Sequence, residues 1–234
     1  MQPTTIASWA IIIWRAFEAR GIDPRPVFER AGLDAARLHD ANARFPVSAM
    51  TRAWEGAVDV TGDPCFGLRA GQYVHPTTFH APGYAWYASR TLHEALARFV
   101  RYTRMVSTGI TLRLVEAGQE VELTLVPASA ALRPSMAAGD AGMVALVMLC
   151  RASCGETFRP QRVRFARPRP SCAEEFDAFF RAPLEYEASD NALVIDAASA
   201  DQPLPTSNIE LATASEQVVI DYLAHLDRTQ IAMQ

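Results

Sequence analysis

The sequence predicts an α+β fold in which a helical N-terminal half packs on a small, antiparallel-biased sheet. Two observations lead to this prediction. Apolar residues recur at three- and four-residue steps through most of the first hundred residues, which is the period of an amphipathic helix. After Gly109, apolar and polar residues alternate, which is the period of a half-buried strand. The elements that follow are expected in the order β-β-α-β-α-β-β, with a linker helix at the C-terminus.

The helices of the N-terminal half are delimited by capping and helix-breaking residues. Threonine and serine side chains cap helix starts, whereas glycine ends helices and proline fits their first turn. Ile6, Trp9 and Ile13 illustrate the helical spacing within the first segment. The expected helices run from Thr4 or Thr5 to Arg20, from Asp23-Pro24 to Ala31-Gly32, from Pro46 to Gly62, from Phe66 to Tyr73, and from Ser89 through Met105.

The C-terminal half begins with a predicted β-hairpin. Its strands, Ile110–Leu114 and Val121–Leu125, alternate on either side of Ala117-Gly118-Gln119. Residues 136–152 are almost uniformly apolar and too many for a strand, so they predict a buried helix. The remaining elements are a strand at Arg162–Ala166, a helix at Cys172–Arg181, strands at Leu184–Tyr186 and Ala192–Ile195, and a last amphipathic helix from Ser207 or Asn208 to about Arg228.

Composition excludes several classes of protein. With 50% hydrophobic and 21% charged residues in 234, the chain is typical of a globular protein rather than a disordered one. Its 26 acidic and 22 basic residues give a net charge of −4, whereas domains that hold nucleic acid usually carry a positive excess. The uncharged run Met1–Trp14 is too short for a membrane span and lacks the basic leader of a signal peptide, so we expect a cytoplasmic protein with no membrane partner. Four cysteines are too few for a disulfide scaffold and indicate a reducing compartment.

The sequence offers no enzyme motif, and we expect neither an enzyme nor a cofactor. It lacks a G-x-S-x-G elbow, a phosphate-binding loop and an H-E-x-x-H pair, and it contains no lysine for a Schiff base. An enzyme whose site is assembled only by the fold is the less favoured alternative. The five histidines fall in different predicted elements: His39, His75, His80, His93 and His225.

Two short patterns admit a functional interpretation but favour a structural one. Cys150 and Cys154, with His75 and His80, could together bind Zn²⁺, yet their spacings are loose and cysteines of an apolar helix are usually core residues. No metal is therefore predicted. A group of arginines could contact nucleic acid, but it alternates with apolar residues and precedes an acidic helix, which favours a solvated face paired with carboxylates. This group comprises Arg159, Arg162, Arg164, Arg167 and Arg169.

Residues 75–105 are the strongest candidate for small-molecule binding. The segment is rich in aromatic side chains that carry polar tips, which suit a pocket needing both apolar area and oriented donors. The alternative is that these aromatics form the core between helices and sheet. If the ligand carries a carboxylate, Arg104 would bind it through both guanidinium nitrogens. The predicted ligand-binding residues are His80, Tyr84, Trp86, Tyr102 and Arg104.

Several short motifs occur in a fixed order along the chain. They are Gly62-Asp63-Pro64-x-x-Gly67-Leu68, Gly83-Tyr84-Ala85, Ser89-x-Thr91-Leu92-x-Glu94-Ala95-Leu96, Arg101-Tyr102, Pro160-x-x-Val163-x-Phe165, Phe179-Phe180-x-Ala182-Pro183-Leu184, Asn191-Ala192-Leu193-x-Ile195 and Pro203-Leu204-Pro205. Taken together, these motifs resemble the N-terminal effector-binding domain of AraC/XylS-type transcriptional regulators, in the branch named arabinose-binding. The resemblance covers about residues 5–210.

The resemblance implies a bacterial regulator that senses a small-molecule effector of unidentified chemistry and forms a homodimer. In this family a domain of two helix-turn-helix units, about a hundred residues long, follows and binds DNA. We therefore expect residues 1–206 to form the effector-binding domain and 207–234 a linker helix leading to a missing DNA-binding domain, so that the chain is truncated and meets DNA only through the absent part. The alternative is a dimerisation module without a ligand. Its contacts would come from Val218, Tyr222 and Leu226 of the last helix or from Ile11 and Trp14 of the first.

Overall fold

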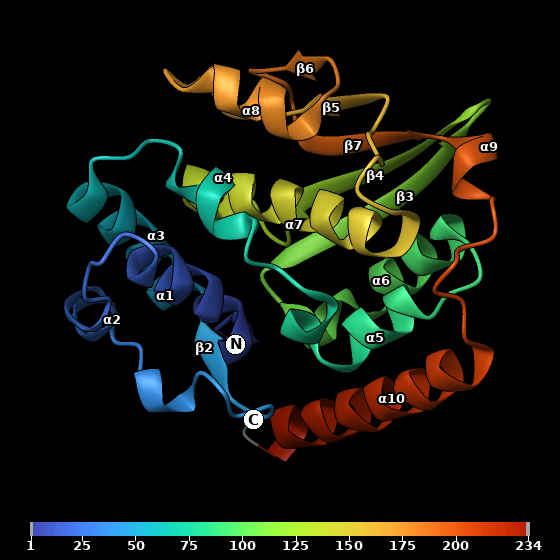
Figure 1. The fold of residues 1–234 in the computed structure, drawn as a ribbon. Coiled ribbons are helices and arrows are strands. Elements are labelled where there is room, and N and C mark those ends of the chain that lie inside the picture. Colours follow the sequence, from blue (N-terminus) through green and yellow to red (C-terminus); the bar gives the residue numbers. More distant parts are fainter. Residues whose placement is uncertain (1, 233–234) are drawn as a thin grey trace.

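The computed structural model describes residues 2–232 and shows the predicted α+β architecture, with most helices on one side of the main sheet and α8 beside β5 and β6 (Figure 1). The N-terminal half contains β1 (Thr4–Ile6), η1 (Ala7–Ala10), α1 (Ile11–Glu18), α2 (Arg25–Ala31), η2 (Ala35–Arg37), β2 (Arg44–Pro46), α3 (Val47–Thr61), α4 (Phe66–Gly71), η3 (Pro76–Phe79), α5 (Ala81–Tyr87) and α6 (Leu92–Val106), where η denotes a 3-10 helix. The C-terminal half contains β3 (Ile110–Ala117), β4 (Glu120–Pro127), α7 (Met136–Cys154), β5 (Arg162–Arg164), α8 (Ala173–Phe180), β6 (Leu184–Glu185), β7 (Asn191–Asp196), α9 (Ala197–Ala200) and α10 (Ile209–Ala232).

The start of the chain differs from the prediction. Residues Thr4, Thr5 and Ile6 form a strand that pairs antiparallel with β2, and the α-helix begins only at Ile11. All three residues are β-branched and favour extended backbone. The Thr5 hydroxyl donates to the main-chain oxygen of Val106 and so ties this strand to the end of α6. The predicted helix from Thr4 or Thr5 was therefore wrong at its start.

Helix α5 lies in a segment for which no helix was predicted, and its first turn contains Pro82 and Gly83. Proline is tolerated there, since the amide hydrogen it lacks has no partner within the helix. Gly83 is needed for packing: a Cβ at this position would lie 1.8 Å from the main-chain oxygen of Pro76. Both residues are thus compatible with a helix at this place.

The main sheet has five strands in the order β3-β4-β7-β5-β6, and every neighbouring pair except β5–β6 is antiparallel. The β3–β4 hairpin has the predicted turn, and Gly118 within it adopts a positive φ of 63°. The antiparallel-biased sheet of the prediction is therefore confirmed.

Helix α7 lies between the sheet and the N-terminal helices (Figure 1). By length and composition it is the one helix among the described residues that could cross a membrane, yet 67% of its apolar window is buried within the protein. It packs very closely on α4: a Cβ at Gly67 would lie 2.1 Å from the Ala137 oxygen, and one at Gly71 would lie 2.7 Å from the Cβ of Val144. The apolar run is thus the central core helix, as its composition predicted.

A disulfide joins Cys65, just before α4, to Cys172, just before α8, with 6.4 Å between their Cα atoms. The small number of cysteines predicts reduced thiols instead. A separation of 107 residues gives no sequence signal that the two thiols meet. Cys150 and Cys154 are free, and burial raises the pKa of both thiols.

Four arginines around β5 pair with carboxylates, as predicted, but only Arg169 pairs with the following helix, whereas Arg162 and Arg164 pair with glutamates of β4. Two arginines of β5 reach bidentately across to glutamates of β4, with distances of 2.8 to 2.9 Å. These ion pairs hold the arginine side chains on the sheet. The pairs are Arg162 with Glu120, Arg164 with Glu122 and Asp190, Arg167 with Asp140, and Arg169 with Asp177.

The last helix runs along the outer side of α5 and α6 (Figure 1). It begins at Ile209 and continues to Ala232, beyond the predicted end near Arg228. A small apolar cluster separate from the main core holds it in place. The cluster consists of Ala81, Tyr102, Met105 and Val219, with Tyr222 and Leu223 packed against it.

Candidate functional site

A cavity of about 360 Å³ lies between the N-terminal helical half and the sheet. Its walls come from the start of α3, the end of α6, the β3–β4 hairpin, one face of α7, and the loop that follows β5. A volume of this size falls within the range of small-molecule sites, which typically begin at about 300 Å³.

Most of the wall is apolar and rigid. On the side of the N-terminal helices, Trp9 stacks on Phe79 at 5.7 Å between ring centroids, and Phe79 meets Phe99 edge-on at 5.3 Å. Across from them, Leu146 and Leu149 line the cavity from α7. Interlocked rings of this kind fix the shape of the wall and offer a large apolar area.

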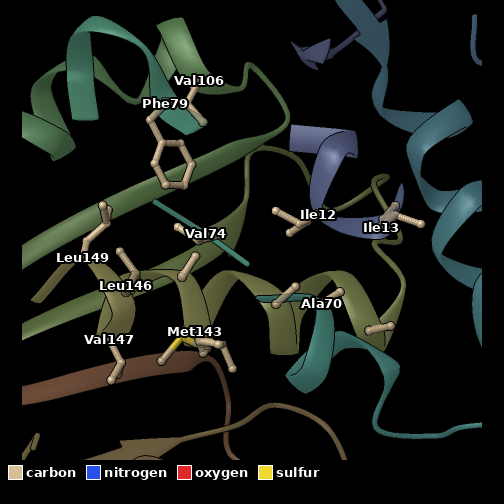
Figure 2. Packing of buried hydrophobic residues seen from close by; sticks show 14 of the residues in the cluster. Ile12, Ile13, Ala70, Val74, Phe79, Val106, Met143, Leu146, Val147 and Leu149 are labelled. Atoms are coloured by element: carbon tan, nitrogen blue, oxygen red, sulfur yellow. The ribbon is translucent and has the colours of Figure 1, made fainter. Parts of the chain in front are cut away.

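Figure 2 shows why one face of α7 contributes to the cavity and the other does not. Leu146 and Leu149 leave the helix on the side of Phe79, whereas Met143 and Val147 leave it toward the opposite side. This separation follows from the 3.6-residue period of the helix.

The cavity exists because small residues face the sheet from the first half of α7. Gly139, Gly142 and Ala145 all line it. A Cβ at Gly142 would already stand 3.2 Å from a methyl group of Leu125 on β4. Larger side chains at these positions would fill the space, so their small size keeps it open.

One buried ion pair forms the polar end of the cavity. Asp140, near the start of α7, is 1% exposed and accepts a hydrogen bond from Nη1 of Arg167, in the loop after β5. Both residues line the cavity. Burial raises the pKa of Asp140 to about 7, although the charge of Arg167 and its hydrogen bond act in the opposite direction. The carboxyl group therefore changes its protonation state near neutral pH.

The loop that carries Arg167 is held from both sides. The Asn191 side-chain oxygen accepts a hydrogen bond of 3.0 Å from the amide of Ala166. The Arg167 guanidinium also lies over the ring of Phe176, 6.0 Å from its centroid. These contacts position Arg167 at the cavity without involving Asp140.

None of the five predicted ligand-binding residues lines this cavity. Trp86 is fully buried, and its Nε1 donates to the main-chain oxygen of Leu149 at 3.2 Å. Tyr84 is 41% exposed on α5. Whether these side chains contact an effector stays a prediction, but the structure does not bring them together around the cavity.

The predicted residues on α6 face the last helix instead. The Tyr102 hydroxyl donates to Glu216 at 2.5 Å, and Arg104 pairs with Asp227 at 2.5 Å. Burial, and next the hydrogen bond to Glu216, raise the pKa of Tyr102. These two residues therefore attach α10 to the domain.

His80, the fifth predicted residue, precedes α5 in an unusual backbone conformation, with φ at 53° and ψ at −135°. Its Nε2 is buried, and among the described residues it has no hydrogen-bond partner. Burial accordingly lowers the pKa of this imidazole. His80 thus lies beside the lining residue Phe79 but is not itself part of the wall.

Asp140 was not among the predicted site residues, and Arg167 was predicted only as one of a group of arginines on a solvated face. A signal for Asp140 was present, because it is the one charged residue in the apolar run of residues 136–150. A carboxylate in such a run needs a partner when buried. Nothing in the sequence indicated that this partner would come from a loop beyond the next strand.

Among the residues that the structure describes, no group of three or more histidine, cysteine, aspartate or glutamate side chains could hold a metal ion.

Comparison with known proteins identifies the fold and the kind of domain. The family model described as the N-terminal arabinose-binding domain of AraC transcription regulators matches residues 21–204. Among solved structures, the transcriptional regulator CdpR from Pseudomonas aeruginosa is similar, with a TM-score of 0.57 and 17% identity over 85% of this chain. At that identity the likeness concerns the fold alone, and this chain covers 61% of the CdpR chain. No curated protein matches the chain in sequence.

Proposed function

Because the chain belongs to the family of N-terminal arabinose-binding-type domains of AraC transcription regulators, we propose that it senses a small-molecule effector that binds in the cavity between α3, α7 and the β3–β4 hairpin. The observation that carries this proposal is the cavity itself, an apolar space of about 360 Å³ with one buried ion pair at its polar end. A rigid apolar wall with few polar anchors is the usual form of a small-molecule site.

Helix α6 provides a physical connection between the cavity and the last helix. Phe99 and Val106 line the cavity from one side of α6. Tyr102 and Met105, from another side, pack in the cluster that holds Val219 of α10. A ligand that moves α6 would therefore change how α10 packs on the domain. We propose that ligand binding is transmitted to α10 in this way.

We propose further that residues 1–206 form the effector-binding domain and that 207–234 form a linker helix toward a helix-turn-helix domain that contacts DNA. Residues 233 and 234 of this segment lie outside the described residues. In favour of this division, α10 packs on the domain through a small separate cluster rather than through the main core. A regulator that acts on DNA would work in the cytoplasm of a bacterial cell.

Dimerisation is a second proposed function, and it is favoured by exposed apolar side chains on α10. Val218, one of the predicted contacts, is 56% exposed. Tyr222, another, packs inward and accepts a hydrogen bond from Arg44 at 3.2 Å. The residues available for a contact with a second copy are Ile209, Leu211, Val218 and Ile220.

A thermal-shift screen of sugars, amino acids, and aromatic and aliphatic acids tests the effector-binding proposal. An effector at a hundred times its Kd stabilises the folded state by about 2.7 kcal/mol, so the unfolding midpoint should rise by several degrees. The variant Ala145→Leu, which fills the cavity, should lose this response while remaining folded. Ala36→Leu, at an exposed position on η2, is the control and should keep it. An equal response in both variants would contradict binding in the cavity.

A further inference from the structure

We infer that the effector is an apolar molecule with a single carboxylate, and that Arg167 binds this carboxylate at the polar end of the cavity. The inference rests on the proposed function and specifies its ligand.

The apolar part of the inference follows from the walls. Most of the polar side chains that line the cavity are committed to the protein main chain. The Thr5 hydroxyl donates to Val106, the Thr51 hydroxyl donates to Val47 at 3.0 Å, and the Ser107 oxygen accepts from the Gly109 amide at 3.1 Å. A ligand rich in hydroxyl groups, such as a sugar, would leave most of them without partners, which is unfavourable in a buried site.

The ion pair must therefore provide the polar contact that holds the ligand. Arg167 uses Nη1 for Asp140 and Nε for the main-chain oxygen of Pro168. Its Nη2 makes no hydrogen bond with any residue that the structure describes. A guanidinium with a free nitrogen at the end of an apolar cavity is suited to a carboxylate, because the N–H groups of that nitrogen can donate charge-assisted hydrogen bonds to it.

The sign of the ligand charge follows from which member of the pair can become neutral. Arginine keeps its proton in proteins, whereas a buried aspartate can take one up. Where Asp140 is ionised before binding, it accepts a proton from solvent as a carboxylate binds Arg167, and the overall charge of the site stays at zero. An ammonium ligand bound to Asp140 would instead leave the guanidinium charged and without its carboxylate. The site therefore accommodates an anion more easily than a cation.

The pH dependence of binding follows from the same proton. Among the described residues, two ionisable groups from other elements interact electrostatically with Asp140: the guanidinium of Arg167 and the buried phenol of Tyr186, which follows β6. Neither changes its charge between pH 6 and 8 in its ordinary state. Carboxylate binding should therefore weaken as the pH rises through this range, because the proton that Asp140 must take up becomes scarcer.

A matched series of ligands with one apolar body tests the inference. We would titrate 3-phenylpropanoate, 3-phenylpropanamide, 3-phenylpropylamine and L-phenylalanine, and decanoate beside decanamide, following tryptophan fluorescence and the heat of binding. Trp9 and Trp54 both line the cavity and report its occupancy. At least one carboxylate should bind about ten- to a hundredfold more tightly than its amide, since a hydrogen bond to a charged group contributes that factor.

Variants of Arg167 test whether this side chain binds the carboxylate. Arg167→Met should remove the preference for carboxylate over amide, and Arg167→Lys should restore part of it by keeping the charge without the fork. Arg169→Met, two residues along the same loop at an exposed position, is the matched control and should change nothing. Circular dichroism establishes that each variant is folded. Asp140→Asn should make carboxylate binding independent of pH, because asparagine cannot take up the proton.

Three outcomes would overturn the inference. Equal affinity for acid and amide would show that no anion is recognised, while the cavity would still bind effectors. Tighter binding of the amine or of L-phenylalanine would make Asp140 the anchor. Binding of none of these compounds, together with no hit in the thermal-shift screen, would refute both the ligand class and the proposed function.

Discussion

The buried carboxyl group of Asp140 should make the stability of the domain depend on pH in an unusual direction. In the unfolded chain its pKa is near 3.8, and in the folded protein burial raises it to about 7. Between these values the unfolded chain releases a proton that the folded protein retains. Stability therefore falls as the pH rises, by about 1.4 kcal/mol for each pH unit. Above pH 7 the penalty is complete, at about 4 kcal/mol.

The variant Asp140→Asn isolates this effect. Asparagine has the size of the protonated acid but cannot ionise, so the contributions of all other groups cancel when the two proteins are compared. The free energy of unfolding of the variant minus that of the wild type should grow by about 3 kcal/mol between pH 5 and 8. Urea denaturation followed by tryptophan fluorescence measures this difference, provided that both proteins unfold in two states with equal m-values.

A control and a refuting result complete this experiment. Asp59→Asn removes one negative charge at an exposed position of α3 and should leave the pH profile of stability close to that of the wild type. If the difference between Asp140→Asn and wild type is flat over this range, or shrinks as the pH rises, then pairing with Arg167 outweighs burial. The reasoning about the polar end of the cavity would then be wrong.

Three further predictions concern the packing of the domain. Reduction of the Cys65–Cys172 disulfide should lower the free energy of unfolding by up to about 4 kcal/mol, because the bond closes a loop of more than a hundred residues. An unchanged midpoint of urea unfolding after reduction would contradict the presence of the bond. Gly67→Ala should destabilise the domain by several kcal/mol, because the new methyl group would meet the α7 main chain at 2.1 Å. Gly139→Ala on α7 is the control and should be neutral or stabilising in the same urea titration. Trp86→Phe should cost about 1–3 kcal/mol, because it removes the hydrogen bond to the Leu149 oxygen and leaves the space of the larger ring unfilled. A loss below about 0.5 kcal/mol would show that this hydrogen bond contributes little.

Much of the fold was predictable because periodicity and capping act locally. The helices that correspond to α2, α3, α4 and α6 begin and end within a few residues of their predicted bounds, and Gly32 and Gly62 adopt the left-handed backbone that ends the first two. The hairpin and the apolar α7 were equally clear. Local patterns failed where a distant partner decided the outcome. Strand β1 depends on pairing with β2, and the disulfide depends on the meeting of α4 and α8.

The site was harder to predict, because the chosen segment reaches the cavity through side chains other than the five predicted ones, whose contact with an effector stays a prediction. Residues 75–105 do supply part of the wall, through Phe79 and Phe99. The helical period directs Tyr102 and Arg104 toward α10, since these polar tips find partners there in Glu216 and Asp227. Which face of an amphipathic helix meets a cavity and which meets another helix depends on tertiary packing, which periodicity alone does not specify.

The same packing explains why the ion pair at the polar end was not foreseen. Asp140 and Arg167 are 27 residues apart and belong to a helix and a loop separated by β5. Their charges were visible in the sequence, but only the fold shows that both reach one cavity. A lone acid inside an otherwise apolar helix is therefore a useful sign of a buried polar site, even when its partner cannot be named.

The most direct test of ligand binding in the cavity is fluorine NMR of the protein labelled with 5-fluorotryptophan, recorded with and without a saturating amount of the tightest carboxylate of the matched series. Trp9 and Trp54 line the cavity, whereas Trp14 packs on Phe28 outside it. We expect the resonances of Trp9 and Trp54 to shift and that of Trp14 to stay in place. A shift of Trp14 with Trp9 and Trp54 unchanged would show that the ligand binds elsewhere.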